Sequence, residues 1–195
     1  MLVRYIAVLA MMPAFGIVIH GPAQADAATD VKKTLQTIYN KRDVATQKKD
    51  VSGSLSTLAP DFVYVAKDGQ KGDVKLLKRR LTPLFALMQE VKAKSDVQKL
   101  TVKGKQATAT VKQHLEMLVV NPQTQQPQRF IADATSEDLW TKTGSGWLQK
   151  RMTTKTETAA LDGRAINERI KLDDKPASGH TADKKKNSRP GGSKG

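Results

Sequence analysis

The sequence contains no cysteine. A chain without thiols can form no disulfide, can give no thiolate ligand to a zinc ion, and carries no lipobox cysteine for a lipid anchor. Histidine is also scarce, with three residues in 195, so the chain has few side chains that bind transition metals. We therefore expect no structural metal and no cofactor, and the stability of the fold has to come from side-chain packing.

Motifs that identify several enzyme classes are absent as well. The sequence has no glycine-rich phosphate loop, no serine nucleophile elbow and no H-E-x-x-H pair on a helix. These absences remove the sequence signals of P-loop nucleotide binding, serine hydrolysis and zinc proteolysis. Any catalytic group has to be found among side chains without a motif.

The first 25 residues have the form of an export signal. Residues 1–4 provide a positive end, residues 5–19 are apolar apart from Pro13 and Gly16, and Ala23-Gln24-Ala25 has the spacing of a cleavage site. An uncleaved membrane anchor is the alternative, but a hydrocarbon core of about 30 Å needs roughly 20 apolar residues, and this run is shorter and interrupted. We expect residues 1–25 to be a signal peptide, cleaved near Ala25, and the mature protein to be periplasmic or secreted.

Acidic residues are few compared with basic ones. The chain has 33 Lys and Arg against 19 Asp and Glu, which gives a net charge of +14 and a pI near 10.0. Such a surface attracts anionic partners at low salt. Outside the cytoplasm these would be acidic polysaccharide, lipid headgroups or cell-wall phosphate, and no nucleic acid is expected. A positive surface that serves only solubility is the alternative.

Three segments in the first half are patterned as amphipathic helices. Apolar residues recur at helical spacing over 30–49, and a shorter helical stretch over 51–58 follows Asp50, a suitable N-cap. A third helix opens at 72–73 and presents a broad apolar face up to residue 88. Pro83 falls inside it and is expected to kink or divide it.

The second half is patterned as strands. A first strand is expected at 61–65, and after residue 90 the apolar period changes from helical to alternating. The strands predicted there are 91–100, 106–120, 129–141 and 147–159. Alternation of apolar with polar residues is typical of antiparallel sheets that are wet on one face. Helices followed by hairpin-linked strands indicate one α+β domain over 26–163, with the helices on one face of the sheet.

Residues 164–195 are expected to be a basic, disordered tail. A short helix is compatible with 164–172, but from residue 173 onward the chain has no aromatic residue and too few apolar groups to offset the entropy of ordering. The tail is a candidate tether to an anionic polymer, and a solvated end is the alternative. The basic residues involved are Lys184, Lys185, Lys186 and Arg189.

Two passages resemble a known superfamily. The first runs from Tyr39-Asn-Lys-Arg-Asp to Leu55-Ser-Thr-Leu-Ala-Pro60-Asp61-Phe62-Val-Tyr64, and the second is the hairpin Asp138-Leu-Trp140-Thr-Lys-Thr-Gly-Ser-Gly146-Trp147. Over residues 28–160 the chain resembles the SnoaL-like branch of the nuclear transport factor 2-like superfamily. The resemblance implies an α+β cone, also described as a cystatin-like roll. In it, three helices are wrapped by a curved, mostly antiparallel sheet, with a cavity at the open end.

The resemblance also indicates what to look for in that cavity. Catalytic members use an acid or a His–Asp pair inside the cone, often with a tyrosine as hydrogen-bond donor, and burial of the acid favours proton abstraction beside a carbonyl. We take Asp133 and His114 as candidate catalytic residues. Candidate ligand-binding residues are Tyr39, Tyr64, Glu137 and Arg151. The alternative for both residues is the wet face of the sheet, since Lys112 and Glu116 share the side of His114.

Three functions follow from these features. The leading one is an exported, non-catalytic domain that binds a small apolar ligand or a protein partner, with a homodimer through the outer sheet face as an option. The second is an isomerase, dehydratase or cyclase that moves a proton with Asp133 or His114. The third is the tether through the basic tail. Trp140 and Trp147, which flank a Gly-Ser-Gly turn, are expected to pack in the core or hairpin rather than against a ligand.

Overall fold

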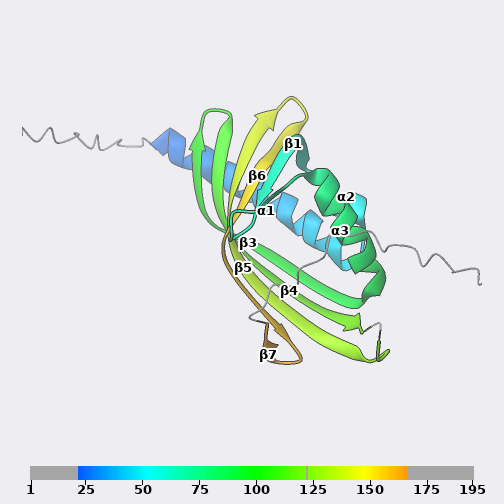
Figure 1. Cartoon of the computed structure of the whole chain (residues 1–195). Helices are drawn as coiled ribbons and strands as arrows, with labels where there is room; N and C mark the ends of the chain where they lie inside the picture. The colour runs from blue at the N-terminus through cyan, green and yellow to red at the C-terminus, as the bar shows by residue number, and fades with distance from the viewer. Residues whose placement is uncertain (1–21, 122, 167–195) are drawn as a thin grey trace, which may run out of the picture.

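A computed structural model describes residues 22–121 and 123–166 (Figure 1). The helices are α1 (Pro22–Gln47), α2 (Val51–Leu55) and α3 (Val74–Leu87). The strands are β1 (Leu58–Val65), β2 (Lys71–Gly72), β3 (Met88–Lys103), β4 (Gln106–Val120), β5 (Pro127–Thr143), β6 (Gly146–Leu161) and β7 (Arg164–Ala165). Within this part of the chain, no helix combines the length and the apolar character needed to cross a membrane.

The strands form one mostly antiparallel sheet in the order β2-β1-β6-β5-β4-β3, with β7 paired to β6. Only the β1–β6 pair among these is parallel. Figure 1 shows the long strands β3 to β6 bending around α1, with α2 and α3 on the same side. Register shifts between Thr135 and Ser136 and between Leu139 and Trp140 interrupt the β5–β6 ladder. Such bulges bend strands. Three helices on one side of a curved, mostly antiparallel sheet confirm the α+β cone that the resemblance implied.

Polar side chains of α1 hold the helix to the edge strand β3. Asp43 accepts hydrogen bonds from the Ser95 backbone nitrogen at 2.7 Å and from its hydroxyl at 2.8 Å. Gln36 accepts from the Val97 nitrogen at 2.9 Å and donates to the Ser95 carbonyl at 2.7 Å. The free backbone groups of an edge strand invite pairing with another chain. Here α1 occupies part of that edge.

Several local predictions can be compared with the structure. Asp50 caps α2, and its side chain accepts from the Gly53 nitrogen at 3.0 Å, as expected. Pro83 lies inside α3, which remains one undivided helix. The second helix was expected to extend over 51–58, but α2 stops at Leu55, and residue 58 and Pro60 belong to β1. An exposed proline is tolerated in a strand where its missing donor faces no partner.

The chain ends differ from the sequence-based boundaries where they are described. Helix α1 begins at Pro22 and therefore includes the predicted cleavage site at Ala25. Strand β7 occupies the start of the tail that we predicted to be disordered, where the sequence was also compatible with a short helix over 164–172. It pairs with β6 through Leu161 and Arg164, a contact between strands that a local sequence pattern does not reveal. Residues 1–21 and 167–195, including the tail cations, lie outside the described residues.

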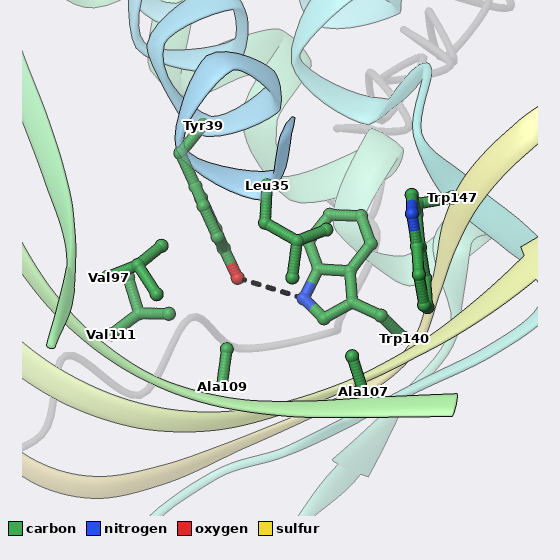
Figure 2. Packing of buried hydrophobic residues seen from close by; sticks show 8 residues of the cluster. All are labelled: Leu35, Tyr39, Val97, Ala107, Ala109, Val111, Trp140 and Trp147. Atoms are coloured by element: carbon green, nitrogen blue, oxygen red, sulfur yellow. Dashed lines mark hydrogen bonds between the residues drawn. The ribbon is translucent and has the colours of Figure 1, made fainter. Parts of the chain in front are cut away.

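Two clusters of apolar side chains fill the space between helices and sheet. In the first, which we call the α1 cluster, Leu35 and Tyr39 pack on residues of β3 to β6 (Figure 2). Its strand residues are Val97, Ala107, Ala109, Val111, Trp140 and Trp147. In the second, the α3 cluster, Phe85 packs with Met88 and Met117. The small side chains of β4 leave room for the large rings above them.

Candidate functional site

A buried tyrosine and a buried aspartate meet inside the cone. Tyr39 lies on α1, and its hydroxyl donates a hydrogen bond to Oδ2 of Asp138 on β5. The indole Nε1 of Trp140 donates to the same Tyr39 oxygen at 3.2 Å (Figure 2). The two rings meet edge to face, with centroids 5.5 Å apart and planes at 81°. The tyrosine hydroxyl therefore bridges a donor and an acceptor, and its orientation is fixed by both.

An arginine completes this site. Arg42 follows Tyr39 by one helical turn on α1, and its guanidinium lies 5.4 Å from the centre of the Tyr39 ring. Its Nη1 donates to Oε1 of Gln149 on β6 at 2.7 Å. We refer to Tyr39, Arg42, Asp138, Trp140 and Gln149 as the Tyr39 cluster. It joins α1 to β5 and β6 through polar contacts inside an otherwise apolar core.

Burial controls the charges of this cluster. It raises the pKa of Asp138, while the hydrogen bond from Tyr39, the neighbouring side chains of Ser136 and Gln149 and the Arg42 charge act in the opposite direction. Burial, followed by the negative charge of Asp138, raises the pKa of Tyr39 well above its ordinary value of 10.0. The phenol consequently stays neutral at physiological pH and keeps its proton for Asp138.

Three polar atoms near Asp138 are buried without a hydrogen-bond partner among the described residues. They are Oδ1 of Asp138, Oγ of Ser136 and Nε2 of Gln149. Ser136 and Asp138 are alternate residues on β5, and Gln149 is opposite Trp140 on the neighbouring strand. Buried polar groups usually have partners. Ser136 and Gln149 lie close enough to Asp138 to lower its pKa, but none of these three atoms reaches hydrogen-bond geometry with a described residue. This place in the core therefore has hydrogen-bonding capacity that the described residues do not fully satisfy.

The raised pKa of Asp138 predicts a pH-dependent stability. The folded protein holds the Asp138 proton more tightly than the unfolded chain, so this residue lowers stability as the pH rises from the ordinary value of 3.8 through its raised pKa. Asp138→Asn carries no such proton. Its free energy of unfolding should rise relative to wild type over that interval and then level off, as measured by urea titrations at a series of pH values.

Asp61→Asn is the control, with the opposite sign. The hydrogen bond from Lys150 lowers the pKa of Asp61, so the wild-type carboxylate contributes stability that is lost as the pH falls. Relative to wild type, Asp61→Asn should become less stable as the pH rises. A stability difference between Asp138→Asn and wild type that does not change with pH would show that the Asp138 pKa is not raised.

The two candidate catalytic residues lie outside the cone. His114 and Asp133 are opposite each other on β4 and β5, with Nδ1 and Oδ1 3.0 Å apart, as a His–acid pair requires. Their side chains are 43% and 47% exposed. Asp133 is on the outer face because Asp138 and Trp140, an odd number of positions away, face the core. The wet-face alternative therefore matches the structure for both His114 and Asp133.

The four candidate ligand-binding residues divide between the faces. Tyr39 is in the core, and Tyr64 is half-buried on the same side of the sheet, where its hydroxyl accepts from Thr154 at 3.4 Å. Glu137 and Arg151 are exposed on the outer face. Glu137 forms an ion pair with Lys155 at 3.3 Å. The structure thus brings together only Tyr39 and Tyr64 on the helix side.

The sequence-based reasoning missed Asp138, Arg42 and Gln149. A usable signal for Asp138 was its place two residues before Trp140, because alternate residues of a strand share a face and a tryptophan is usually well buried. The expectation for the tryptophans themselves is confirmed, since Trp140 and Trp147 both belong to the α1 cluster. No short sequence pattern signals Arg42 or Gln149, whose contact spans 107 positions.

Near the β3–β4 and β5–β6 turns, the side chains of the α1 cluster fill the space between α1 and the sheet. A depression of about 250 Å³ lies instead on the outer face of the β3–β4 hairpin. It is lined by Thr101, Lys103, Gln106 and Thr108. These side chains contain no acid–base pair, so the depression is not a candidate for the proton-transfer chemistry that the resemblance implies.

Comparison with solved structures identifies the fold. A nuclear transport factor 2-like superfamily protein from Salmonella enterica serovar Typhimurium is 16% identical with a TM-score of 0.51, and the match covers 73% of this chain and 96% of that protein. A candidate scytalone dehydratase from Novosphingobium aromaticivorans is 11% identical with a TM-score of 0.55, covering 69% and 90%. A candidate aromatic ring hydroxylase from the same organism is 14% identical with a TM-score of 0.51, covering 72% and 96%.

These matches show that the chain has the nuclear transport factor 2-like fold, which the resemblance predicted. No protein-family model matches the sequence, and neither does any curated protein. At such low identity the solved structures indicate the fold and not the reaction. The named neighbours differ in the chemistry ascribed to them, so the function has to be argued from the side chains of this chain.

Proposed function

We propose that this protein is an exported, non-catalytic binding domain. The observation that carries the proposal is the closure of the Tyr39 cluster, in which Tyr39 is 1% exposed and Asp138 is 0% exposed. A group that moves a proton to or from a substrate has to reach it within hydrogen-bonding distance. Asp138 and Tyr39 instead bond to each other, and the His114–Asp133 pair faces solvent.

The α3 cluster is the part of the described structure that favours a small apolar ligand. Beside the buried Phe85, Met88 and Met117 it has a border of half-buried apolar residues from α2, α3 and β3 to β5. The border consists of Val51, Leu81, Leu84, Val91, Leu115, Val119 and Phe130. Methionine side chains are flexible and adapt to irregular shapes. A ligand that enters between α3 and the sheet would meet these groups first.

An enzyme is the second candidate, because the buried acid has a raised pKa and an unpartnered oxygen of its own, and it lies beside a tyrosine donor and two further unpartnered polar atoms. Such a set resembles acid–base sites in which a carboxyl is kept in an apolar environment. For this chemistry the substrate would have to separate Tyr39 from Asp138. Turnover abolished by Asp138→Asn, in a variant that still binds the ligand, would favour the enzyme.

The test is mass spectrometry of the protein purified from its native compartment. We expect a mature chain that begins at Asp26, together with a bound apolar molecule. This molecule should displace a fluorescent apolar dye from the stripped protein, and Leu84→Gln, in the border of the α3 cluster, should weaken its binding about tenfold. The matched Leu148→Gln, on the outer face, should leave the affinity unchanged.

The outcomes separate the alternatives. A protein that co-purifies in place of a small molecule would support the partner-binding form of the proposal. The proposal would be contradicted if neither a small molecule nor a protein co-purified and if no apolar extract of the native compartment displaced the dye. A chain that keeps residues 1–25 would contradict export by cleavage. The tether through Lys184, Lys185, Lys186 and Arg189 stays a prediction, since these residues lie outside the described part of the chain.

A further inference from the structure

Positive charge is concentrated where two hairpins of the sheet turn. The segments 97–115 and 139–156, which form the turns and much of β3–β4 and β5–β6, contain no Asp or Glu. The hairpins adjoin each other, since the Lys142 nitrogen donates to the Lys105 carbonyl at 2.8 Å. Figure 1 shows both hairpins at one end of the molecule. The lysines of the two turns therefore belong to one surface.

The outer face of the sheet continues this surface. Lys99 and Lys103 are opposite Thr110 and Gln106, and Arg151 continues the row that contains Thr101 and Thr108. Neighbouring strands lie about 4.8 Å apart, so this row is compact. We define the basic hairpin surface as Lys99, Lys103, Lys105, Lys142 and Arg151, all of them exposed.

The charges of this surface are not neutralised within the described part of the chain. None of its five side chains forms an ion pair or a hydrogen bond there. Glu137, the acid nearest to it along β5, is paired with Lys155 at 3.3 Å. Asp61 is likewise paired with Lys150, at 2.5 Å. The acids at the border therefore have their own partners, and the positive field of the surface is available to an external anion.

The depression on the β3–β4 hairpin lies within this surface. Its lining combines the Lys103 ammonium with two threonine hydroxyls and the Gln106 amide. These groups can satisfy both a carboxylate and the hydroxyls beside it. With a volume of about 250 Å³, the depression has room for one charged sugar residue. The remaining lysines and Arg151 would contact the charges of neighbouring sugar residues in the same polysaccharide.

We propose that the basic hairpin surface binds an acidic polysaccharide. Single-stranded nucleic acid is disfavoured because its binding relies on stacking on aromatic rings, and no aromatic residue belongs to this surface. Double-stranded nucleic acid is disfavoured by the export on which the proposed function rests. Anionic lipid headgroups also attract a cluster of cations, but interfacial binding is strengthened by an inserted apolar face, which this surface lacks. The large exposed apolar residues, Val44 and Leu87, lie on other elements. The surface is also distinct from the α3 cluster, which lies on the helix side of the sheet.

The test compares two charge reversals of the full-length mature chain. Lys103→Glu/Lys105→Glu alters the basic hairpin surface, and Lys75→Glu/Lys78→Glu makes the same change in net charge on exposed positions of α3. Affinity for polygalacturonate is measured at low salt. The hairpin variant should bind about tenfold more weakly than wild type, because its reversed charges would touch the polymer. The α3 variant should lose less than about threefold, because its reversed charges act only from a distance and are screened by salt.

Each result bears on the proposal. Equal losses in the two variants would overturn it in favour of the net charge, and unchanged binding in the hairpin variant would overturn it in favour of the tail, which both variants retain. Equally tight, equally sensitive binding to polyphosphate or to anionic lipid vesicles would overturn the choice of polysaccharide. Urea unfolding has to show that both variants are as stable as wild type. Both variants should still bind the fluorescent apolar dye as wild type does, so failure of this proposal can be told apart from failure of the proposed ligand site in the α3 cluster.

Discussion

Tyr39→Phe should lower the free energy of unfolding by about 3 kcal/mol, because it leaves two buried polar groups without a partner. The lost hydroxyl donates to Asp138 and accepts from Trp140 at 3.2 Å. Phenylalanine keeps the ring and its contact with the indole, so the loss reports on the hydrogen bonds and not on the volume. Urea denaturation at neutral pH, followed by far-UV circular dichroism, measures it.

A matched tyrosine provides the control. Tyr64→Phe removes a half-buried hydroxyl whose hydrogen bond is 3.4 Å long, and it should cost less than about 1 kcal/mol. In an Asp138→Asn background, Tyr39→Phe should cost about half as much, because a neutral amide left unpaired is penalised less than a carboxylate. If Tyr39→Phe were as stable as wild type, the bridge that we describe would not exist in solution.

Trp140→Ala should lower the free energy of unfolding by about 4 kcal/mol, close to the upper end for removal of a buried aromatic side chain. Trp140 is 0% exposed and is the largest fully buried side chain of the described residues. Its loss opens a cavity under α1 and removes the indole donor to Tyr39. The measurement is urea denaturation, together with loss of the near-UV signal of the Tyr39–Trp140 pair.

The comparison residue is Leu148, on the same β5–β6 hairpin but opposite Thr141 on the outer face. Leu148→Ala should cost about 1 kcal/mol, since a half-buried leucine loses less apolar contact. Equal costs for the two alanine variants would mean that the two faces of the hairpin do not differ in packing. That result would contradict the assignment of the helix side as the core.

Much of the fold was accessible from local patterns. Helical spacing and an N-cap at Asp50 placed the helices, and alternation placed the four long strands within a few residues of their observed ends. The predicted ends of an element were wrong where a contact with a distant part of the chain extends it. Strand β1 begins at Leu58, before the predicted residue 61, and pairs there with Gln149 across 91 positions of sequence. Such pairing has no local signal.

The candidate site was predicted less well. The sequence drew attention to Asp133 and His114, which do meet, but on the wet face. The period of two in a strand says which residues share a face and leaves open which face is buried. Helix α1 settles this on β5, because Tyr39 and Leu35 pack against the side that carries Asp138 and Trp140.

By itself, the sequence determined the order of the three helices and of the long strands, the excess of positive charge, the absence of thiol chemistry and the resemblance from which the cone was predicted. These properties depend on composition and on neighbours within a few residues. Only the tertiary structure decided that Tyr39 meets Asp138, 99 positions later, and that lysines of two hairpins share one surface. The physical reason is that pKa, burial and surface potential depend on distance in space, which is set by how the strands pair.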